Sequence, residues 1–170
     1  MGNAFDVIII GGGIGGLATA LSLHDIGLKP RIYEQAKEIR PLGVGINLLP
    51  HAVRELSELG LLDKLRSTGV ETDELRFYTQ YGLEIQREPR GTKAGYNWPQ
   101  FSIHRGELQM LLYEAVLERI GPDCLKTNHT ATDLQQNEAK VRVSFGNSIT
   151  KKNIKTDKAD IVIAADGIHS

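Results

Sequence analysis

The chain has little of several residue types that mark specialised classes of protein. Its 170 residues include one cysteine, one tryptophan and two methionines, and its formal net charge is −1. Because Cys124 is the only cysteine, an internal disulfide is excluded, which fits a reducing compartment. The balanced charge gives no electrostatic reason to expect nucleic acid or an anionic membrane as a partner. No apolar run approaches the length of a membrane span. We therefore expect a cytoplasmic protein, either a monomer or a homodimer.

The first residues have the pattern of a βαβ unit. Residues 5–10 form a run that is β-branched and apolar except at Asp6, typical of a strand that is buried on both faces. From residue 14 the apolar period becomes helical, and Gly27 ends this helix. Residues 31–34 then form a second short strand. A right-handed crossover makes the two strands parallel neighbours.

The later segments add helices and antiparallel strands. Helical patterns cover 51–67, as one helix or a pair, and 105–120. A hairpin is expected from 75–79 and 83–87, followed by a loop over 91–99. Strand patterns cover 124–136, 140–145 and 160–165; Cys124 is expected as a half-buried strand residue, and the lysine-rich stretch 151–158 as a solvated turn. The whole order predicts an α/β fold with a parallel sheet and a β-meander.

A glycine-rich loop lies where the first strand meets the first helix. Gly11, Gly13 and Gly16 satisfy the G-x-G-x-x-G spacing. The first glycine permits a tight turn, the second lets the backbone approach a pyrophosphate, and the third lets helix and strand pack closely. The N–H groups of the helix start, which includes Ile14 and Gly15, point to the phosphates together with the positive end of the helix dipole. The loop therefore predicts a dinucleotide site.

An acidic residue stands at the end of the next strand. Glu34 follows Gly16 by 18 residues, the distance at which a carboxylate accepts the hydroxyls of the adenosine ribose. Such a carboxylate repels a 2′-phosphate, which disfavours NADP at this site. An exposed strand-end carboxylate with no ligand is the alternative interpretation. Spacing alone does not separate FAD from NAD.

Three stretches together resemble the single-component, flavin-dependent aromatic hydroxylases, the class A flavin monooxygenases. The first is the glycine loop with Ala20, Gly27 and Glu34 in register. The second covers residues 101–108 and places Arg105 at the start of a long helix, and the third covers residues 164–170 with Asp166 and Gly167. The resemblance implies that Arg105 contacts FAD near its pyrophosphate. It also implies that the Asp-Gly pair takes part in binding FAD and NADH or NADPH.

The loop over residues 38–47 is similar to the flavin-side loop of salicylate- and phenazine-type hydroxylases. The resemblance implies FAD contacts from Arg40, Val44 and Gly45, and from Gln35, the neighbour of Glu34. Each motif also has an interpretation without a ligand. In it, Gly43, Gly45 and Asp166 are turn residues, and Arg105 is a solvated residue of the first helical turn. His104 and His169 flank the motifs, and we expect them to serve packing or to face solvent.

The chain also departs from the family pattern. The family's Asp-Gly motif continues to an arginine, and a Gly-Asp motif lies much further along; neither is present here. We therefore expect residues 1–170 to be the N-terminal part of a Rossmann-like FAD-binding domain of the glutathione-reductase type, incomplete at its C-terminus. Part of the substrate-domain sheet, about 71–100, is expected as an insertion.

The resemblance implies an FAD-dependent, NAD(P)H-dependent monooxygenase that uses O₂ to hydroxylate a small aromatic substrate, phenazine- or salicylate-like. The 170-residue piece alone is expected to be inactive. The sequence assigns no catalytic residue and contains no metal-ligand cluster. Two alternatives remain open: an FAD-linked reductase or dehydrogenase without oxygen transfer, and a dinucleotide-binding module without chemistry.

Overall fold

A computed structural model describes residues 6–150 and 152–169 of the chain. The chain folds as two compact units. Unit 1 consists of Met1–Arg40 and Gln109–Ser170, and unit 2 of Pro41–Leu108. Within the described residues no helix is both long enough and apolar enough to cross a membrane.

A parallel sheet forms the centre of unit 1. Its strands are β1 (Val7–Ile10), β2 (Arg31–Tyr33), β8 (Leu125–Lys126) and β12 (Ile161–Ala164), in the order β12-β1-β2-β8. Strand β1 has a neighbour on each side, and Val7, Ile8 and Ile9 are fully buried. This burial explains the unbroken apolar run, since a strand covered on both faces needs no polar alternation. The predicted parallel pairing of the first two strands is confirmed.

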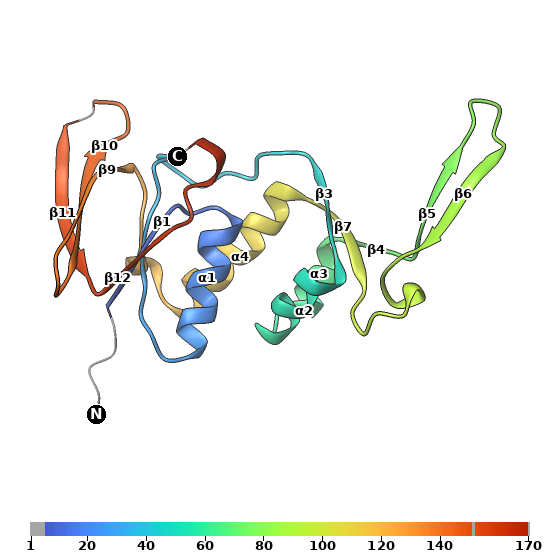
Figure 1. Cartoon of the computed structure of the whole chain (residues 1–170), viewed down its shortest axis with the longest axis horizontal. Helices are drawn as coiled ribbons and strands as arrows, with labels where there is room; N and C mark the ends of the chain where they lie inside the picture. The colour runs from blue at the N-terminus through green and yellow to red at the C-terminus, as the bar shows by residue number, and fades with distance from the viewer. Residues whose placement is uncertain (1–5, 151, 170) are drawn as a thin grey trace. The chain divides into compact units, whose positions relative to one another are not determined.

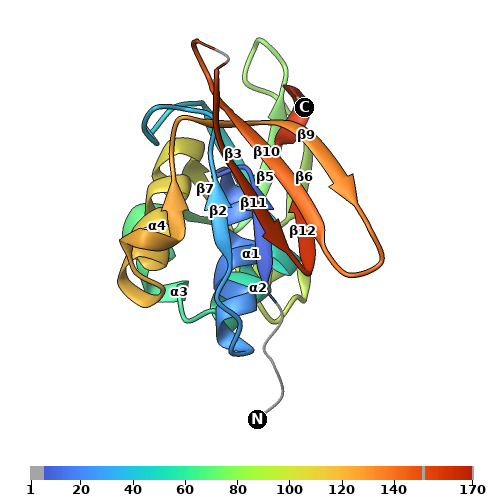
Figure 2. The ribbon, with the colours of Figure 1, turned by 90° about the vertical axis from the view of Figure 1, so that its left-hand side faces the viewer.

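Two kinds of layer cover this sheet (Figures 1 and 2). On one side lie α1 (Ile14–Asp25) and the unit 1 part of α4 (Arg105–Arg119). On the other lies an antiparallel meander of β9 (His129–Gln136), β10 (Val141–Asn147) and β11 (Asn153–Ala159), in the order β11-β10-β9. Unit 1 is therefore the α/β fold with a β-meander that the sequence predicts.

An apolar core joins the sheet to the meander. Ile8 and Tyr33 from the sheet pack against Val143, Phe145 and Ala159 from the meander. The rings of Tyr33 and Phe145 are stacked with their centroids 4.0 Å apart. Full burial of a side chain of this size contributes about 1.5–3 kcal/mol. Val143 and Phe145 therefore lie on the buried face of β10.

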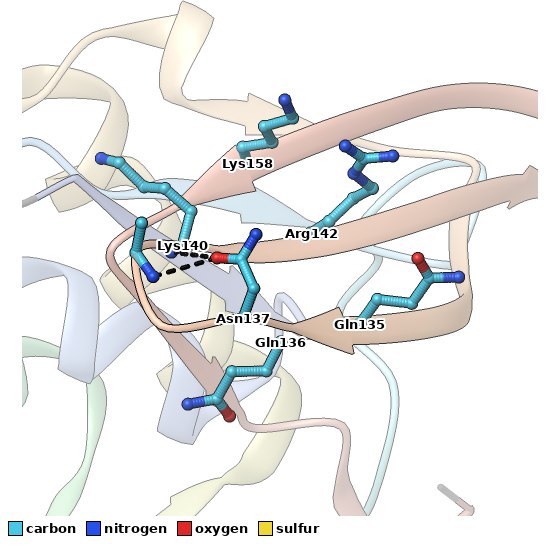
Figure 3. A pocket seen from close by; sticks show the side chains of 7 residues that line it. Gln135, Gln136, Asn137, Lys140, Arg142 and Lys158 are labelled. Carbon is cyan, nitrogen blue, oxygen red and sulfur yellow. Dashed lines mark hydrogen bonds between the residues drawn. The ribbon is translucent and has the colours of Figure 1, made fainter.

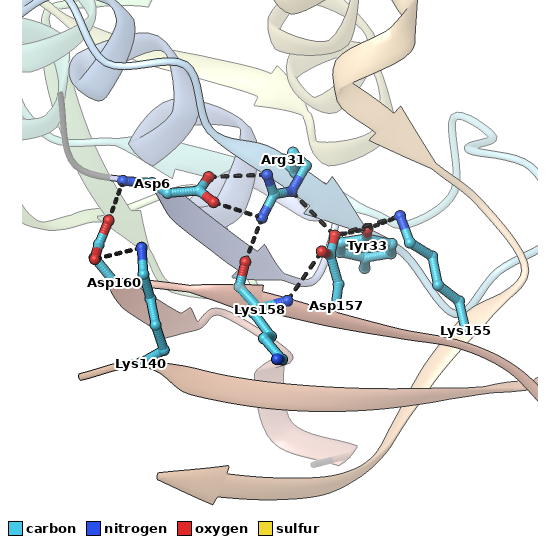
Figure 4. Close-up of polar contacts among 8 residues, drawn as sticks. All are labelled: Asp6, Arg31, Tyr33, Lys140, Lys155, Asp157, Lys158 and Asp160. Atoms are coloured by element: carbon cyan, nitrogen blue, oxygen red, sulfur yellow. Dashed lines mark hydrogen bonds and ion pairs between the residues drawn. The ribbon is translucent and has the colours of Figure 1, made fainter. Parts of the chain in front are cut away.

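A polar cluster ties the same layers together at one edge (Figure 4). The Arg31 guanidinium lies between Asp6, 2.8 Å away, and Asp157, 3.1 Å away. The Tyr33 hydroxyl donates to Asp157 at 2.5 Å and accepts from the Lys155 ammonium at 3.0 Å. Burial acts to raise the pKa of Asp157, but the hydrogen bond from Tyr33 and the nearby cations hold that pKa below its usual value. The Asp157 carboxylate therefore stays charged where the meander meets β2.

Unit 2 is built around an antiparallel sheet of β3 (Gly45–Leu48), β7 (Gln100–His104) and β4 (Val70–Thr72), in the order β3-β7-β4. The helices α2 (Pro50–Glu58) and α3 (Leu62–Thr68) confirm the expected helix pair. The strands β5 (Glu74–Tyr78) and β6 (Glu84–Pro89) form the expected hairpin, and Gly82 lies in its turn with φ +82°. Strand β7 leads directly into α4 at Arg105.

The expected solvated turn over residues 151–158 is wrong. Residues Asn153–Ala159 form strand β11, which pairs with β10 along its length. The turn lies earlier, where the Asn147 side-chain oxygen accepts the N–H groups of Ile149 and Thr150. Lysines suit an edge strand, because their charge stays in water while the backbone completes the sheet.

The strand pattern over 124–136 also differs in detail. Cys124 is half-buried, as expected. It is not in a strand, because it ends a 3-10 turn over Pro122–Cys124. Partial burial raises the pKa of its thiol, which disfavours the reactive thiolate. Asn128 then takes a left-handed conformation with φ 60°, which divides the pattern into β8 and β9. The predicted loop around residue 45 is shorter, since β3 begins at Gly45.

Candidate cofactor-binding site

Two glycines of the loop after β1 are required by the packing of unit 1 itself. Gly11 has φ +108°, and a Cβ there would lie 2.3 Å from the carbonyl oxygen of Ala165. A Cβ on Gly16 would lie 2.0 Å from the carbonyl oxygen of Gly11. Both contacts are with backbone, which cannot move aside as a flexible side chain does. These glycines therefore set the tight turn and the close approach of α1 to β1, as the sequence pattern predicts.

Gly13 and Gly15 behave differently. Apart from the two chain neighbours of each glycine and, for Gly15, the backbone of its own helix, no atom of the described residues lies within 4 Å of the position that a Cβ would take. Gly13 has φ −76°, which any residue adopts. Neither packing nor backbone conformation within the described chain requires glycine at position 13. The space beside it fits a ligand that lies directly against the backbone.

The start of α1 is open to an anion. Gly13 is the N-cap, no side-chain hydrogen bond caps the helix, and its first turn, all within the described residues, carries no acidic residue. The first N–H groups of a helix have no acceptor within the helix, and they lie at its positive end. Ile14 and Gly15 belong to this first turn. The open space at Gly13 and these N–H groups together suit the pyrophosphate of a dinucleotide.

Glu34 lies directly after β2 and is held by two backbone donors. One carboxylate oxygen accepts the Gly12 N–H at 2.6 Å, and the other accepts the Ala36 N–H at 2.7 Å. Each oxygen has a second lone pair, so the oriented carboxylate can still accept ribose hydroxyls. The neighbouring Gln35 is exposed. The geometry thus fits the predicted role of Glu34.

Asp166 and Gly167 follow β12 and reach the same edge of the sheet. The Ala165 N–H donates to the carbonyl oxygen of Ile10 at 2.8 Å, so the residues after β12 lie beside Gly11. Asp166 is exposed, and Gly167 has φ +77°. The glycine loop, Glu34 and the Asp-Gly pair therefore follow three neighbouring parallel strands at their carboxyl ends, where ligands of open α/β sheets bind. The side chain of His169 lies outside the described residues.

One residue of this site carried no prediction. The side-chain amide of Gln109, on α4, donates to the carbonyl oxygen of Gly12 at 3.0 Å. Gln109 lies one helical turn after Arg105, so its position on the predicted helix was a usable signal. The residue type gave no such signal, because a glutamine on a helix is usually solvated.

Unit 2 brings together Val44, Gly45 and Arg105. The backbone N–H of Arg105 donates to the carbonyl oxygen of Val44 at 2.9 Å, and Gly45 pairs with His104 in the β3–β7 ladder. The side chains of Val44 and Arg105 are exposed. Arg40, in unit 1, is also exposed and forms an ion pair with Glu38. FAD contacts from these residues stay predictions.

His104 fixes the loop in front of β3. Its Nδ1 accepts the N–H of Gly106 at 3.2 Å, which leaves the proton on Nε2, 3.0 Å from the carbonyl oxygen of Gly43. A Cβ on Gly106 would lie 2.4 Å from the carbonyl carbon of Pro41, so the loop closes tightly over the start of α4. His104 is thus exposed and hydrogen-bonds the backbone of the loop, within the expectation that it serves packing or faces solvent.

A hollow of about 290 Å³ lies elsewhere in unit 1 (Figure 3). It is lined by polar and basic side chains, and all of its lining residues are exposed. They come from the end of β9, the turn that follows it, the start of β10 and β11: Gln135, Gln136, Asn137, Ala139, Lys140, Arg142 and Lys158. None of them belongs to the glycine loop, to the Asp-Gly turn or to the end of β2. The hollow is therefore separate from the candidate cofactor site.

Comparison with known proteins agrees with this geometry. Residues 4–170 match the family model described as "FAD binding domain". The chain belongs to this family. This match, together with relatives named as hydroxylases or monooxygenases, confirms the resemblance to flavin-dependent hydroxylases. The fold class given by the sequence is also confirmed, and the cofactor of this FAD-binding domain is FAD.

Relatives of the domain are named as hydroxylases and monooxygenases. It is 44% identical over 166 residues to "Phenazine 1,6-dicarboxylic acid hydroxylase PhzS" of Lysobacter antibioticus, an alignment that covers 97% of this chain and 41% of that protein. It is 34% identical to a 3-hydroxybenzoate 6-hydroxylase of Polaromonas naphthalenivorans, with 96% of this chain and 40% of that protein covered. The domain thus spans about two fifths of the length of these relatives.

Solved structures share the fold. The R204Q variant of HpxO from Klebsiella pneumoniae, in complex with FAD, superposes with a TM-score of 0.79 at 26% identity, covering 98% of this chain and 40% of that one. The p-nitrophenol 4-monooxygenase PnpA from Pseudomonas putida DLL-E4 superposes with a TM-score of 0.85 at 21% identity, covering 98% of this chain and 42% of that one. At that identity the second likeness establishes the fold alone.

Proposed function

We propose that this FAD-binding domain serves a flavin-dependent monooxygenase that hydroxylates an aromatic substrate with O₂ and NADH or NADPH. The observation that carries the proposal is the open space at Gly13, where a Cβ would contact no described atom beyond its chain neighbours. This space lies beside the uncapped start of α1, and the oriented carboxylate of Glu34 follows the next strand. Names of relatives that match nearly the whole chain support the hydroxylase over a reductase.

Each predicted site residue receives a role in this proposal. The N–H groups of Gly13, Ile14 and Gly15 bind the pyrophosphate, and Glu34 accepts the ribose hydroxyls, with Gln35 beside it. Gly11 and Gly16 shape the loop. Asp166 and Gly167 in unit 1 contact the cofactor from the end of β12. Contacts from Arg40, Val44, Gly45 and Arg105 rest on the family resemblance. When bound, the flavin supplies the redox chemistry that activates O₂, and the protein supplies position and a dry environment.

The substrate class follows from the names of several relatives. Those names include a phenazine dicarboxylic acid, 3-hydroxybenzoate, 3-amino-4-hydroxybenzoate and 6-hydroxynicotinate, which are all aromatic acids. We propose an aromatic acid as the substrate, phenazine- or salicylate-like. We also propose that the complete protein acts in the cytoplasm, as a monomer or homodimer, and that residues 1–170 alone are inactive.

Two measurements on the complete protein test this function. The purified protein is expected to carry flavin in a 1:1 ratio, with an absorption band near roughly 450 nm that is set by the cofactor. O₂ uptake coupled to NADH or NADPH oxidation should then increase when an aromatic acid is added. Oxidation of NAD(P)H without such stimulated O₂ uptake would favour the reductase. Retention of NAD in place of flavin would favour the binding module.

A further inference from the structure

The peptide groups on either side of Gly12 are held by two side chains from distant parts of unit 1. The Gly12 N–H donates to Glu34, which follows β2, at 2.6 Å. The Gly12 carbonyl oxygen accepts from the Gln109 amide, on α4, at 3.0 Å. Gly12 is buried and the bond from Gln109 is partly buried, so water competes little for these contacts. The proposed function gives Glu34 a role toward the ribose, and it gives Gln109 none.

The contact with Gln109 fixes the direction of a neighbouring donor. In a trans peptide the carbonyl of one residue and the N–H of the next point in opposite directions. The structure contains no cis peptide among the described residues. Because Gln109 holds the Gly12 carbonyl on its own side, the Gly13 N–H is turned away from α4. Among the hydrogen bonds of the described residues the Gly13 N–H has no acceptor, and apart from its chain neighbours no described atom lies within 4 Å of the position that a Cβ would take on Gly13.

The packing of helix α4 holds the backbone of Gln109 in place. Leu112, Ala115 and Val116 are buried, and α4 runs over 15 residues from Arg105 to Arg119. The glutamine is thus anchored by packing that does not depend on a bound cofactor. A glutamine suits this place because its amide donates without carrying charge. A carboxylate of the same shape would set an acceptor against the Gly12 carbonyl and place a negative charge near the phosphates.

We propose that Gln109 is a positioning residue for the dinucleotide: it orients the Gly12–Gly13 peptide so that the Gly13 N–H binds the pyrophosphate. This inference rests on the proposed function only in requiring a dinucleotide at the glycine loop. It holds for FAD and for NAD alike, since both contain ADP. Gln109 itself need not touch the cofactor.

The experiment compares ligands with and without the pyrophosphate. The complete protein, freed of cofactor, is titrated with ADP and with adenosine, and separately with FAD, by calorimetry. We expect Gln109→Met, which removes the donor at similar size, to raise the Kd of ADP and of FAD by about 3- to 10-fold. The Kd of adenosine should stay within about twofold. Gln109→Glu should raise the Kd of ADP by at least about tenfold, because repulsion is added to the lost bond.

A matched control comes from the meander. Gln135 is exposed on β9, and its amide donates only to Asp133 among the contacts that the structure describes. Gln135→Met should leave all three Kd values unchanged. Thermal melting of the cofactor-free proteins separates positioning from folding, because a merely structural glutamine would lower the melting temperature and weaken ADP and adenosine equally.

The outcomes decide the proposal in either direction. A selective loss of ADP affinity supports it, whether the wild-type protein prefers FAD or NAD, so failure of the flavin assignment does not carry over. An equal loss for ADP and adenosine, or no loss in both Gln109 variants, overturns it. Should the Met variant fail to fold, Gln109→Ala, which also removes the donor without adding a charge, gives the same comparison.

Discussion

Two glycine-bearing loops of the chain, residues 11–16 and 41–45, differ in how they are built. In the loop from Gly11 to Gly16, backbone atoms of unit 1 exclude any side chain at Gly11 and Gly16, at 2.3 and 2.0 Å. In the loop from Pro41 to Gly45 of unit 2, the fixing contacts come from the His104 side chain and the Arg105 N–H, and the loop residues are exposed.

The two loops differ in the interactions that fix their conformation. The first loop lies between a fully buried strand and a packed helix, so its shape is set by the core and is costly to change. The second loop is held at its surface by a few hydrogen bonds, each with a net value of about 0.5–1.5 kcal/mol. We expect a substitution in the first loop to affect mainly folding or mainly binding, depending on the glycine that is changed. In the second loop, we expect the loss of a single hydrogen bond to have a small effect on the free energy of unfolding.

The largest effect is expected for Gly16→Ala. The new methyl group would lie 2.0 Å from the Gly11 carbonyl oxygen, so β1 and α1 must separate, at a cost of about 3 kcal/mol or more in the free energy of unfolding. Gly15→Ala is the control one residue earlier, where no described atom outside the helix backbone lies within 4 Å. It should stabilise the cofactor-free protein by up to about 1 kcal/mol through helix propensity. Urea unfolding of both variants checks this; equal stabilities would contradict the packing role of Gly16.

A smaller and different effect is expected for Gly13→Ala. The free energy of unfolding without cofactor should change by less than about 1 kcal/mol, because the methyl group meets no described atom within 4 Å. The Kd for FAD should nevertheless rise at least about tenfold, because the methyl group occupies the space of the pyrophosphate. Calorimetric titration with FAD measures both this variant and Ser22→Ala, an exposed control on α1. An unchanged Kd for Gly13→Ala would show that the pyrophosphate lies elsewhere.

The same contrast explains how far the sequence could predict the structure. The first loop was predictable residue by residue, since its spacing follows from local geometry that Gly11, Gly16 and Glu34 satisfy. The strand β11 was not, because its pairing partner β10 decides that a lysine-rich stretch becomes a strand. The role of Gln109 was also not visible, since its partner is a backbone carbonyl 97 positions away. No side-chain pattern encodes such a contact.

The smallest effect is expected for His104→Leu in the second loop. The variant keeps the size of the side chain but loses the donor to the Gly43 carbonyl and the acceptor for the Gly106 N–H. Because His104 is exposed, water replaces these partners, and the free energy of unfolding should fall by about 1 kcal/mol or less. Urea unfolding measures the change against His51→Leu, an exposed control on α2. Limited proteolysis should meanwhile show faster cleavage between residues 40 and 45 in the His104 variant alone. A loss as large as that of Gly16→Ala would mean that the second loop, too, is part of a core, and the distinction between the two loops would fail.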